Sequence, residues 1–269
     1  MYGAILGDIA GSRFEFSHPQ GFCAKKEVLF APSSRYTDDT VMTIATKYAV
    51  LTGTSYAKAY GSFGRRYKKA GYGPLFLTWL DNRSEKGYNS YGNGAAMRVS
   101  FLGHYYNSLR EVEREAKKSA ECTHNHPEGI KGAVCVAGCV FLAEHGATKK
   151  QILHYAKEFG YHKLYPLWVR RPFEKFDLTC QHSVPLALRC FLESNSWEEC
   201  IRNVYSVHCD TDTIAAIAGG IADSFFHGTG FEEERLLRHY LVKPTAQGTT
   251  DTFLYDWAVK EWRNPTYDR

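Results

Sequence analysis

The chain has 269 residues, of which 44% are hydrophobic and 23% are charged. This composition is typical of a globular protein and excludes a disordered or fibrous one, and the length is sufficient to bury a substantial core. The formal net charge of +4 is small, so charge alone does not favour a nucleic-acid partner, although a nucleic-acid substrate is not excluded.

The sequence pattern predicts a cytoplasmic protein with no membrane association. The first residues lack the basic stretch of a signal peptide, and the most apolar stretch, residues 132–143, is shorter than the roughly 20 residues that cross a bilayer. The eight cysteines include no Cys-x-x-Cys pair, which argues against a zinc site. Cys135 and Cys139 are four apart in an apolar helical pattern, so we expect buried, reduced thiols in a reducing compartment.

Helical periodicity recurs along the chain, and no alternation of apolar and polar residues is long enough to predict a convincing strand. Pro185 predicts a kink or a boundary in one of the apolar segments. The expected helices cover residues 40–51, 108–120, 127–144, 178–193, 197–207, 213–226 and 250–262. The chain has no fixed-period repeat and no Pro- or Ser-rich linker, so we expect one compact all-α domain over residues 1–269. No feature of the sequence predicts an oligomeric state.

Three segments outside these helices are rich in glycine, proline, aromatic and charged residues. They cover residues 17–35, 71–93 and 161–177. Long loops of this kind in a helical enzyme usually build the binding site. We therefore expect these loops to surround the site.

Two acidic clusters stand directly before apolar helical patterns. Their sequences are Thr37-Asp38-Asp39-Thr40 and Asp210-Thr211-Asp212-Thr213. Thr and Asp side chains are typical N-caps, because they accept hydrogen bonds from the free amides at a helix start. For either cluster alone, capping is the simpler interpretation.

The presence of two such clusters favours a metal centre instead. Each cluster offers only hard oxygen ligands, and four carboxylates brought together would repel one another unless cations neutralised them. Oxygen-only ligation favours Mg²⁺, Mn²⁺ or Ca²⁺ over zinc, although His208 and Cys209 precede the second cluster. Periodicity does not bring the clusters together, because they lie far apart in the sequence.

Five ordered motifs resemble those of the ADP-ribosylglycohydrolases related to dinitrogenase-reductase-activating glycohydrolase, and the likeness covers nearly the whole chain. They are Gly7-Asp8-Ile9-Ala10-Gly11-Ser12-Arg13-Phe14-Glu15, Tyr36-Thr37-Asp38-Asp39-Thr40, Asn89-Ser90-Tyr91-Gly92-Asn93-Gly94-Ala95-Ala96-Met97-Arg98, Thr123-His124-Asn125-His126-Pro127-Glu128-Gly129, and Asp210-Thr211-Asp212-Thr213-Ile214-Ala215-Ala216-Ile217-Ala218-Gly219-Gly220. The match departs just before Asp210, where relatives often have small residues and this chain has His208 and Cys209, which would narrow the leaving-group side.

The resemblance implies a compact orthogonal helical bundle that binds two Mg²⁺ or Mn²⁺ ions beside an ADP-ribose pocket. The implied metal ligands are Thr37, Asp38, Asp39, Asp210, Asp212 and Thr213. Glu15 is implied to lie close to the metals on a mobile loop. The implied substrate-binding residues are Asn89, Ser90, Tyr91, Gly92, Asn93, Gly94 and His124. The adenine-stacking aromatic residue of some relatives has no match, because the corresponding stretch is Ser84-Glu85-Lys86, so Tyr91 is the candidate for stacking.

Cleavage of the glycosidic bond at C1″ of ADP-ribose develops positive charge on the ribose. Two metals would orient the sugar hydroxyls and activate water. Five carboxylates, Glu15 and the four aspartates, against two divalent cations leave a formal charge of −1, which suits a cationic transition state. Proton transfer is assigned to Glu15 or to a metal-bound aspartate such as Asp39 or Asp212, and the sequence favours neither.

The glycine-rich loop has two interpretations. Gly92 and Gly94 would let backbone amides approach a diphosphate at a helix start, or they form an ordinary turn that caps a helix. Arg98 is expected to be a surface or ion-paired arginine, and His126 to be structural. For His124, substrate binding and a structural role are about equally favoured.

The predicted activity is metal-dependent release of ADP-ribose from a modified protein side chain or another ADP-ribose conjugate. One alternative is a dimetal hydrolase of a free nucleotide or of a different conjugate. The other is a non-catalytic relative that binds ADP-ribose or has a structural role. Retention of Glu15 and both acidic clusters argues against the second alternative, since nothing else requires four mutually repelling aspartates.

Overall fold

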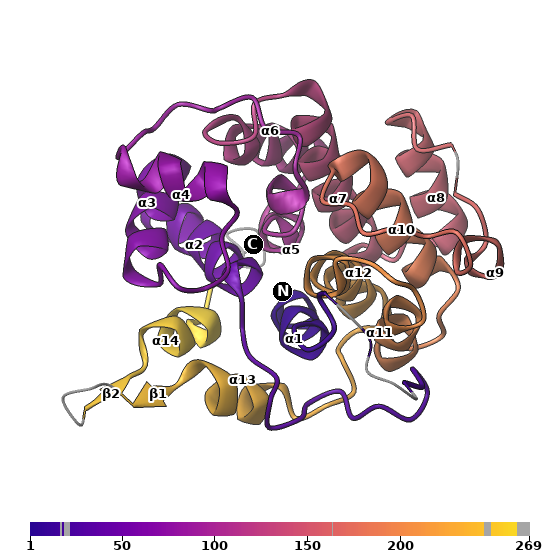
Figure 1. Cartoon of the computed structure of the whole chain (residues 1–269). Coiled ribbons are helices and arrows are strands. Elements are labelled where there is room, and N and C mark those ends of the chain that lie inside the picture. The colour runs from indigo at the N-terminus through magenta and orange to yellow at the C-terminus, as the bar shows by residue number, and fades with distance from the viewer. Residues whose placement is uncertain (17, 19–21, 163, 245–248, 263–269) are drawn as a thin grey trace, which may run out of the picture.

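The computed structural model describes residues 1–16, 18, 22–162, 164–244 and 249–262. The expectation of an all-α protein is confirmed, because the structure is 60% helical with almost no sheet in the described part of the chain (Figure 1). The helices are α1 (Tyr2–Gly11), α2 (Asp38–Thr52), α3 (Tyr56–Arg66), α4 (Pro74–Asp81), the 3₁₀ helix η1 (Asn93–Ala95), α5 (Ser100–Tyr105), α6 (Leu109–Glu121), α7 (Pro127–Glu144), α8 (Lys149–Glu158), α9 (Leu167–Arg170), α10 (Cys180–Leu192), α11 (Trp197–Tyr205), α12 (Thr211–Phe226), α13 (Glu233–Leu241) and α14 (Phe253–Val259). Two short strands, β1 (Lys243–Pro244) and β2 (Thr250–Asp251), pair antiparallel.

Helices α1 and α12 lie side by side at the centre of the molecule (Figure 1). Glycines line the face of α1 that meets α12. A Cβ at Gly7 would lie 2.2 Å from the Ala215 carbonyl oxygen, and one at Gly11 would lie 2.5 Å from the Thr211 carbonyl oxygen. Only glycine allows the two backbones to approach so closely.

The remaining helices pack around this central pair. Helix α2 packs against α1, α3, α5 and α14, and α7 packs against α5, α6, α10 and α12 (Figure 1). The 18-residue helix α7 is buried along most of its length, as its small apolar residues predict. No helix in the described part of the chain is long and apolar enough to span a membrane.

Most of the expected helices are present with shifted ends. Helix α2 begins at Asp38, two residues before the predicted start, because Thr37 caps it, and Gly53 ends it with a φ of 69°. Of the two outcomes predicted at Pro185, a kink or a boundary, the boundary is absent, since α10 continues through this residue. The predicted helix over 250–262 is shortened to α14, because Thr250 and Asp251 pair with β1 instead.

Two of the predicted loops contain helices. Residues 71–93 include α4, and residues 161–177 include the four-residue helix α9. The expected helix ranges also missed α1, α3, α5, α8 and α13. In α1 and α3, glycines within the segment obscure the helical signal, and packing against neighbouring helices overrides their low helix propensity.

Candidate metal centre and substrate pocket

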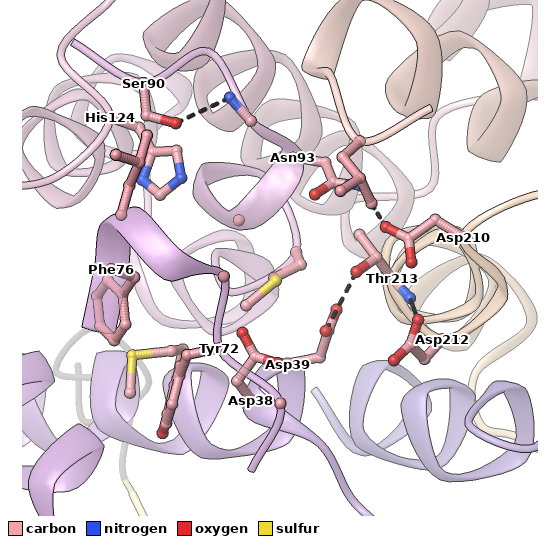
Figure 2. Close-up of a pocket in the computed structure, with 18 of the residues that line it drawn as sticks. Asp38, Asp39, Tyr72, Phe76, Ser90, Asn93, His124, Asp210, Asp212 and Thr213 are labelled. Carbon is pink, nitrogen blue, oxygen red and sulfur yellow. Dashed lines mark hydrogen bonds between the residues drawn. The ribbon is translucent and has the colours of Figure 1, made fainter. Parts of the chain in front are cut away.

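The two acidic clusters lie together, at the adjacent starts of α2 and α12. The Thr213 hydroxyl donates a hydrogen bond of 3.2 Å to Asp39 Oδ2, across a sequence separation of 174 residues. Figure 2 shows Asp38 and Asp39 facing Asp210, Asp212 and Thr213 across a short gap. Packing of both helices against α1 brings about this meeting, which the sequence left open.

Carboxylate oxygens gather in two overlapping groups. In one group, oxygens of Asp8, Asp39 and Asp212 all lie within 4.8 Å of one another. In the other, oxygens of Glu15, Asp210 and Asp212 lie within the same limit. We call the acidic residues of both groups, together with Asp38, the acidic cage. Asp212 belongs to both groups, so it stands at the centre of this cage.

Asp8 is a member of this cage that the sequence interpretation did not assign to the site. Its buried carboxylate accepts hydrogen bonds from the Thr37 amide at 2.9 Å, the Thr37 hydroxyl at 2.7 Å and the Thr40 amide at 3.1 Å. Asp8 therefore fixes the start of α2 onto α1. A single acid within the apolar stretch Gly3–Gly11 is the sequence signal that could have identified it.

The capping interpretation accounts for only part of the two clusters. The Thr37 side chain caps α2 by accepting from the Asp39 amide at 3.3 Å. Asp210 occupies the N-cap position of α12 without a capping hydrogen bond from its side chain. Its carboxylate instead accepts from Asn93 Nδ2 at 2.7 Å, so Asn93 orients Asp210.

Burial and mutual repulsion raise the pKa of the carboxyl groups in the cage. Burial, followed by the charge of Asp8, raises the pKa of Asp38 to about 8 and that of Asp39 well above its ordinary value. Burial and then the charge of Asp210 raise the pKa of Asp212 well above its ordinary value and that of Glu15 to about 7. Protons or cations must therefore compensate these charges when the protein is folded.

The cage is suited to divalent cations. Its donors are all oxygens, which Mg²⁺ and Mn²⁺ prefer. The buried Asp39 Oδ1 has no hydrogen-bond partner among the described residues, although buried polar atoms are normally paired. Cations near this oxygen would satisfy it and relieve the repulsion between the aspartates.

A pocket of about 430 Å³ opens beside the cage. Its lining includes Asp38, Asp39, Asp210, Asp212 and Thr213. Tyr72 lies beside Asp38, and Phe76 and His124 lie farther from the aspartates (Figure 2). Phe16, Phe176 and Leu178 line the pocket with Glu15 and are partly or largely exposed.

His208 and Cys209 are not among the lining residues, since Cys209 is buried in the core and the ring of His208 packs near that of His18. The expected narrowing by these two side chains is therefore wrong.

The glycine-rich loop supplies part of the pocket wall. Of the predicted substrate-binding residues, the pocket is lined by Ser90, Gly92, Asn93, Gly94 and His124. Asn89 and Tyr91 lie outside the lining: Asn89 is exposed, and Tyr91 packs its ring against His126. The Gly92 amide donates to the Ser90 hydroxyl at 3.1 Å (Figure 2).

His124 is held in a fixed position on the wall opposite the aspartates. It is buried, its Nδ1 lies 2.8 Å from the Thr123 hydroxyl, and burial lowers its pKa well below the ordinary value. The ring is therefore neutral at physiological pH. A Cβ at Gly94 would lie 3.1 Å from His124 Nε2, so this glycine leaves the ring room.

Arg98 is buried and forms no ion pair among the described residues, which contradicts the expectation of a surface or ion-paired arginine. It is 1% exposed, and its guanidinium group stacks over the Tyr60 ring at 4.1 Å. The same group donates to the Ser119 carbonyl oxygen at 2.7 Å and to the Thr123 hydroxyl at 2.8 Å. Because Thr123 also contacts His124, Arg98 supports the wall behind the histidine.

The expectation that His126 is structural is confirmed, since its ring caps α7.

Aromatic residues around α4 form a feature of the pocket that the sequence interpretation missed. Tyr72 and Phe76 are buried, line the pocket, and lie with their ring centroids 5.0 Å apart. They give the pocket an aromatic side that begins with Tyr72 beside Asp38 and continues to Phe76 (Figure 2). The sequence pattern predicts a loop over residues 71–93, so it does not indicate these rings as candidates for adenine stacking.

The comparisons with known proteins agree with this geometry. The family model for ADP-ribosylglycohydrolase matches residues 1–229, and the chain belongs to that family. Among curated proteins, it is similar to ADP-ribosylhydrolase ARH3 of Mus musculus, with 28% identity over 84% of this chain and 82% of the relative. It is also similar to ARH3 of Homo sapiens, with 27% identity over 84% of each chain, and of Xenopus tropicalis, with 26% identity over 97% of this chain and 93% of the relative.

A solved structure shares the fold. An ADP-ribosylglycohydrolase-related protein complex contains a chain that superposes with a TM-score of 0.68 and 23% identity, over 88% of this chain and 89% of that one. This likeness supports the all-α architecture.

Proposed function

We propose that this protein is a metal-dependent hydrolase that cleaves the glycosidic bond at C1″ of ADP-ribose and releases ADP-ribose from a conjugate. The observation that carries the proposal is the meeting of the two acidic clusters beside a pocket in a member of the ADP-ribosylglycohydrolase family. The names of the curated relatives describe ADP-ribosylhydrolases, which supports the same activity here.

The proposed metal ligands are the two Thr/Asp clusters. Two Mg²⁺ or Mn²⁺ ions bound by Thr37, Asp38, Asp39, Asp210, Asp212 and Thr213 would supply Lewis-acid activation of water and of the ribose hydroxyls. Of these six residues, Asp39, Asp210 and Asp212 belong to the two groups of closely spaced carboxylate oxygens. Asp8 positions the first cluster through Thr37, and Asn93 positions Asp210. Glu15 belongs to the same cage, on the side of the pocket mouth.

The rest of the pocket is proposed to bind the nucleotide. Ser90, Gly92 and Gly94 would contact the diphosphate from the glycine-rich loop, and His124 would donate a hydrogen bond to the diphosphate from its neutral ring. Tyr72 and Phe76 offer aromatic faces for adenine, in place of Tyr91. The nucleotide would then lie across the pocket with its distal ribose at the aspartates.

Glu15 is proposed to transfer the proton. It is partly exposed and its carboxylate faces Arg35 at 3.8 Å, whereas Asp39 and Asp212 are buried in the cage. A group at the mouth can exchange protons with solvent and reach both water and the leaving group. Asp39 and Asp212 would then hold the centre in place and stabilise positive charge on the ribose.

A panel of defined ADP-ribose conjugates tests the proposal. Release of ADP-ribose would be measured by chromatography with Mg²⁺, with a chelator, and after Mg²⁺ is restored. We expect release that is lost with chelator and recovered with metal. Hydrolysis of free nucleotides in preference to every conjugate would support a nucleotide hydrolase instead, and ADP-ribose binding without turnover would support a non-catalytic binding protein.

A further inference from the structure

In the segment of residues 165–178, between α8 and α10, large aromatic side chains are exposed and two charged side chains are buried, the reverse of the usual distribution. Trp168 and Phe173 are 74% and 79% exposed, whereas the side chains of Arg170 and Glu174 are only 11% and 4% exposed. Globular proteins normally bury aromatic rings and expose charged groups. Exposed rings gathered in one short segment are typical of an interaction surface.

Ion pairs hold this inverted segment in place. Arg170 donates to Glu174 from Nε at 2.6 Å and from Nη2 at 2.9 Å, and Glu174 also pairs with His182 of α10. These inward contacts orient the segment so that its rings point outward. The exposure of the rings is therefore a property of the folded segment.

The segment leads directly to the proposed active site. The Asn93 amide donates to the Leu178 carbonyl oxygen at 2.8 Å, which attaches the end of the segment to the glycine-rich loop. Phe176 lines the pocket, and its ring centroid lies 6.1 Å from that of Phe16, next to Glu15. Helix α9 lies at the edge of the molecule (Figure 1), so the outward side of the segment runs from that edge to the pocket mouth.

The fully exposed charges of the segment are positive. Arg171 and Lys175 are exposed, whereas Glu174 is buried in its ion pairs and Asp177 is half-buried and accepts from the Thr179 amide at 2.7 Å. Exposed rings interspersed with cations are the features that bind single-stranded nucleic acid, because bases stack on the rings and phosphates contact the cations. A duplex keeps its bases stacked and does not offer them to the rings.

We propose that the outward side of residues 165–178 binds single-stranded nucleic acid and presents ADP-ribose carried on that strand to the adjacent pocket. The second part of this statement rests on the proposed hydrolase function, and the first part does not. The side chains that carry the binding are Trp168, Arg171, Phe173 and Lys175.

The direct test is binding of a fluorescein-labelled, unmodified single strand of about 12 nucleotides, measured by fluorescence anisotropy. The variant W168A/K175A should bind roughly tenfold more weakly or worse. Its slope of log Kd against log salt should fall by about 0.7, because one phosphate contact is lost. The matched control V28A/K150A removes one exposed apolar residue and one exposed lysine from other surfaces, and it should bind like the wild type.

Hydrolysis assays distinguish a failure of the proposed nucleic-acid binding from a failure of the proposed hydrolase function. On an ADP-ribosylated single strand, W168A/K175A should raise KM with little change in kcat, while turnover of a small ADP-ribose conjugate stays unchanged. Absence of oligonucleotide binding, or equal loss in the control variant, would overturn the proposal. A raised KM for an ADP-ribosylated protein instead of the oligonucleotide would also overturn it and would assign the surface to a protein partner. Oligonucleotide binding as expected, without hydrolysis of any conjugate, would refute only the proposed function.

Discussion

Asp210 and Asp212 are two residues apart, yet their surroundings differ. Asp210 accepts a hydrogen bond from the Asn93 side chain, whereas Asp212 accepts one from the Thr213 amide at 2.9 Å. The sequence alone predicts both aspartates as candidate metal ligands, because carboxylate side chains are recognisable as hard oxygen donors. It did not predict Asp8 or the orienting role of Asn93, because these depend on which side chains meet across helices.

The substitution D212N tests the metal-ligand role of Asp212. It removes one negative charge from the centre of the cage and nearly keeps the shape of the side chain. We expect folding to survive while turnover of an ADP-ribose conjugate falls on the order of a hundredfold or more. A capping role alone would cost about 1 kcal/mol of stability and leave turnover intact. Thermal melts, metal titration and turnover measured together distinguish the two, and full metal-dependent activity would contradict the role.

The substitution G92V tests the proposed nucleotide-binding loop. A Cβ at Gly92 would lie 3.3 Å from the Ser90 hydroxyl oxygen and closer to no other atom, so the Ser90 side chain must shift slightly to accommodate it. The branched side chain would instead occupy space that a diphosphate needs. We expect ADP-ribose to bind at least about tenfold more weakly by calorimetry, with metal binding unchanged. Unaltered affinity for ADP-ribose would place the diphosphate elsewhere in the pocket.

At the scale of elements, the close approach of α1 and α12 determines where the acidic clusters lie. The second cluster is at the start of α12, and α1 carries Asp8, which fixes the start of α2. The sequence predicted α2, α7 and α12 because their apolar spacing is clear. It missed α1 and α4, since α1 is rich in glycine and α4 is short, and tertiary packing stabilises both. Because α4 was not predicted, the aromatic residues of the pocket in and beside this helix were not predicted either.

The substitution G7A tests the α1–α12 contact. A methyl group at this position would lie 2.2 Å from the Ala215 carbonyl oxygen, so the two helices must separate. We expect a loss of about 1–3 kcal/mol in the free energy of unfolding and weaker metal binding, because both clusters depend on this contact. The matched control is G73A, whose Cβ would meet nothing within 4 Å. Equal stability of the two variants in urea unfolding would refute the account of this interface.

At the scale of the whole molecule, a small net charge of +4 conceals a strongly acidic centre. Asp8, Glu15, Asp38, Asp39, Asp210 and Asp212 all have raised pKa values, and burial is the largest cause for each. Such a centre opposes folding unless protons or cations compensate its charges. Composition could not reveal this, because the charges come from distant parts of the chain.

The stability of the metal-free protein should therefore depend on pH. The pKa of Asp38 rises from an ordinary 3.8 to about 8 on folding, so between these values the folded state binds more protons than the unfolded state. The contribution of Asp38 to the free energy of unfolding is fully present below pH 3.8 and is lost as the pH rises towards 8. Asp8, whose pKa is raised to about 6, adds a loss of the same sign. In chelator, we expect the Tm to drop across this range, with a shallower drop for D38N.

Mg²⁺ should offset this loss. Binding to the ionised carboxylates of the folded state stabilises it, so Mg²⁺ should raise the Tm more at pH 8 than at pH 5.5. Differential scanning calorimetry at both pH values, with the metal or with chelator, measures the difference. Equal effects of Mg²⁺ at the two pH values would contradict the acidic centre as its binding site.

The location of bound metal tests the central claim, that the two acidic clusters form one centre, more directly than any other measurement. Crystals soaked in Mn²⁺ would be examined by anomalous diffraction. The account predicts two anomalous peaks roughly 3.5–4 Å apart, between Asp38 and Asp39 on one side and Asp210 and Asp212 on the other. Peaks confined to one cluster, or no peak at either one, would contradict it.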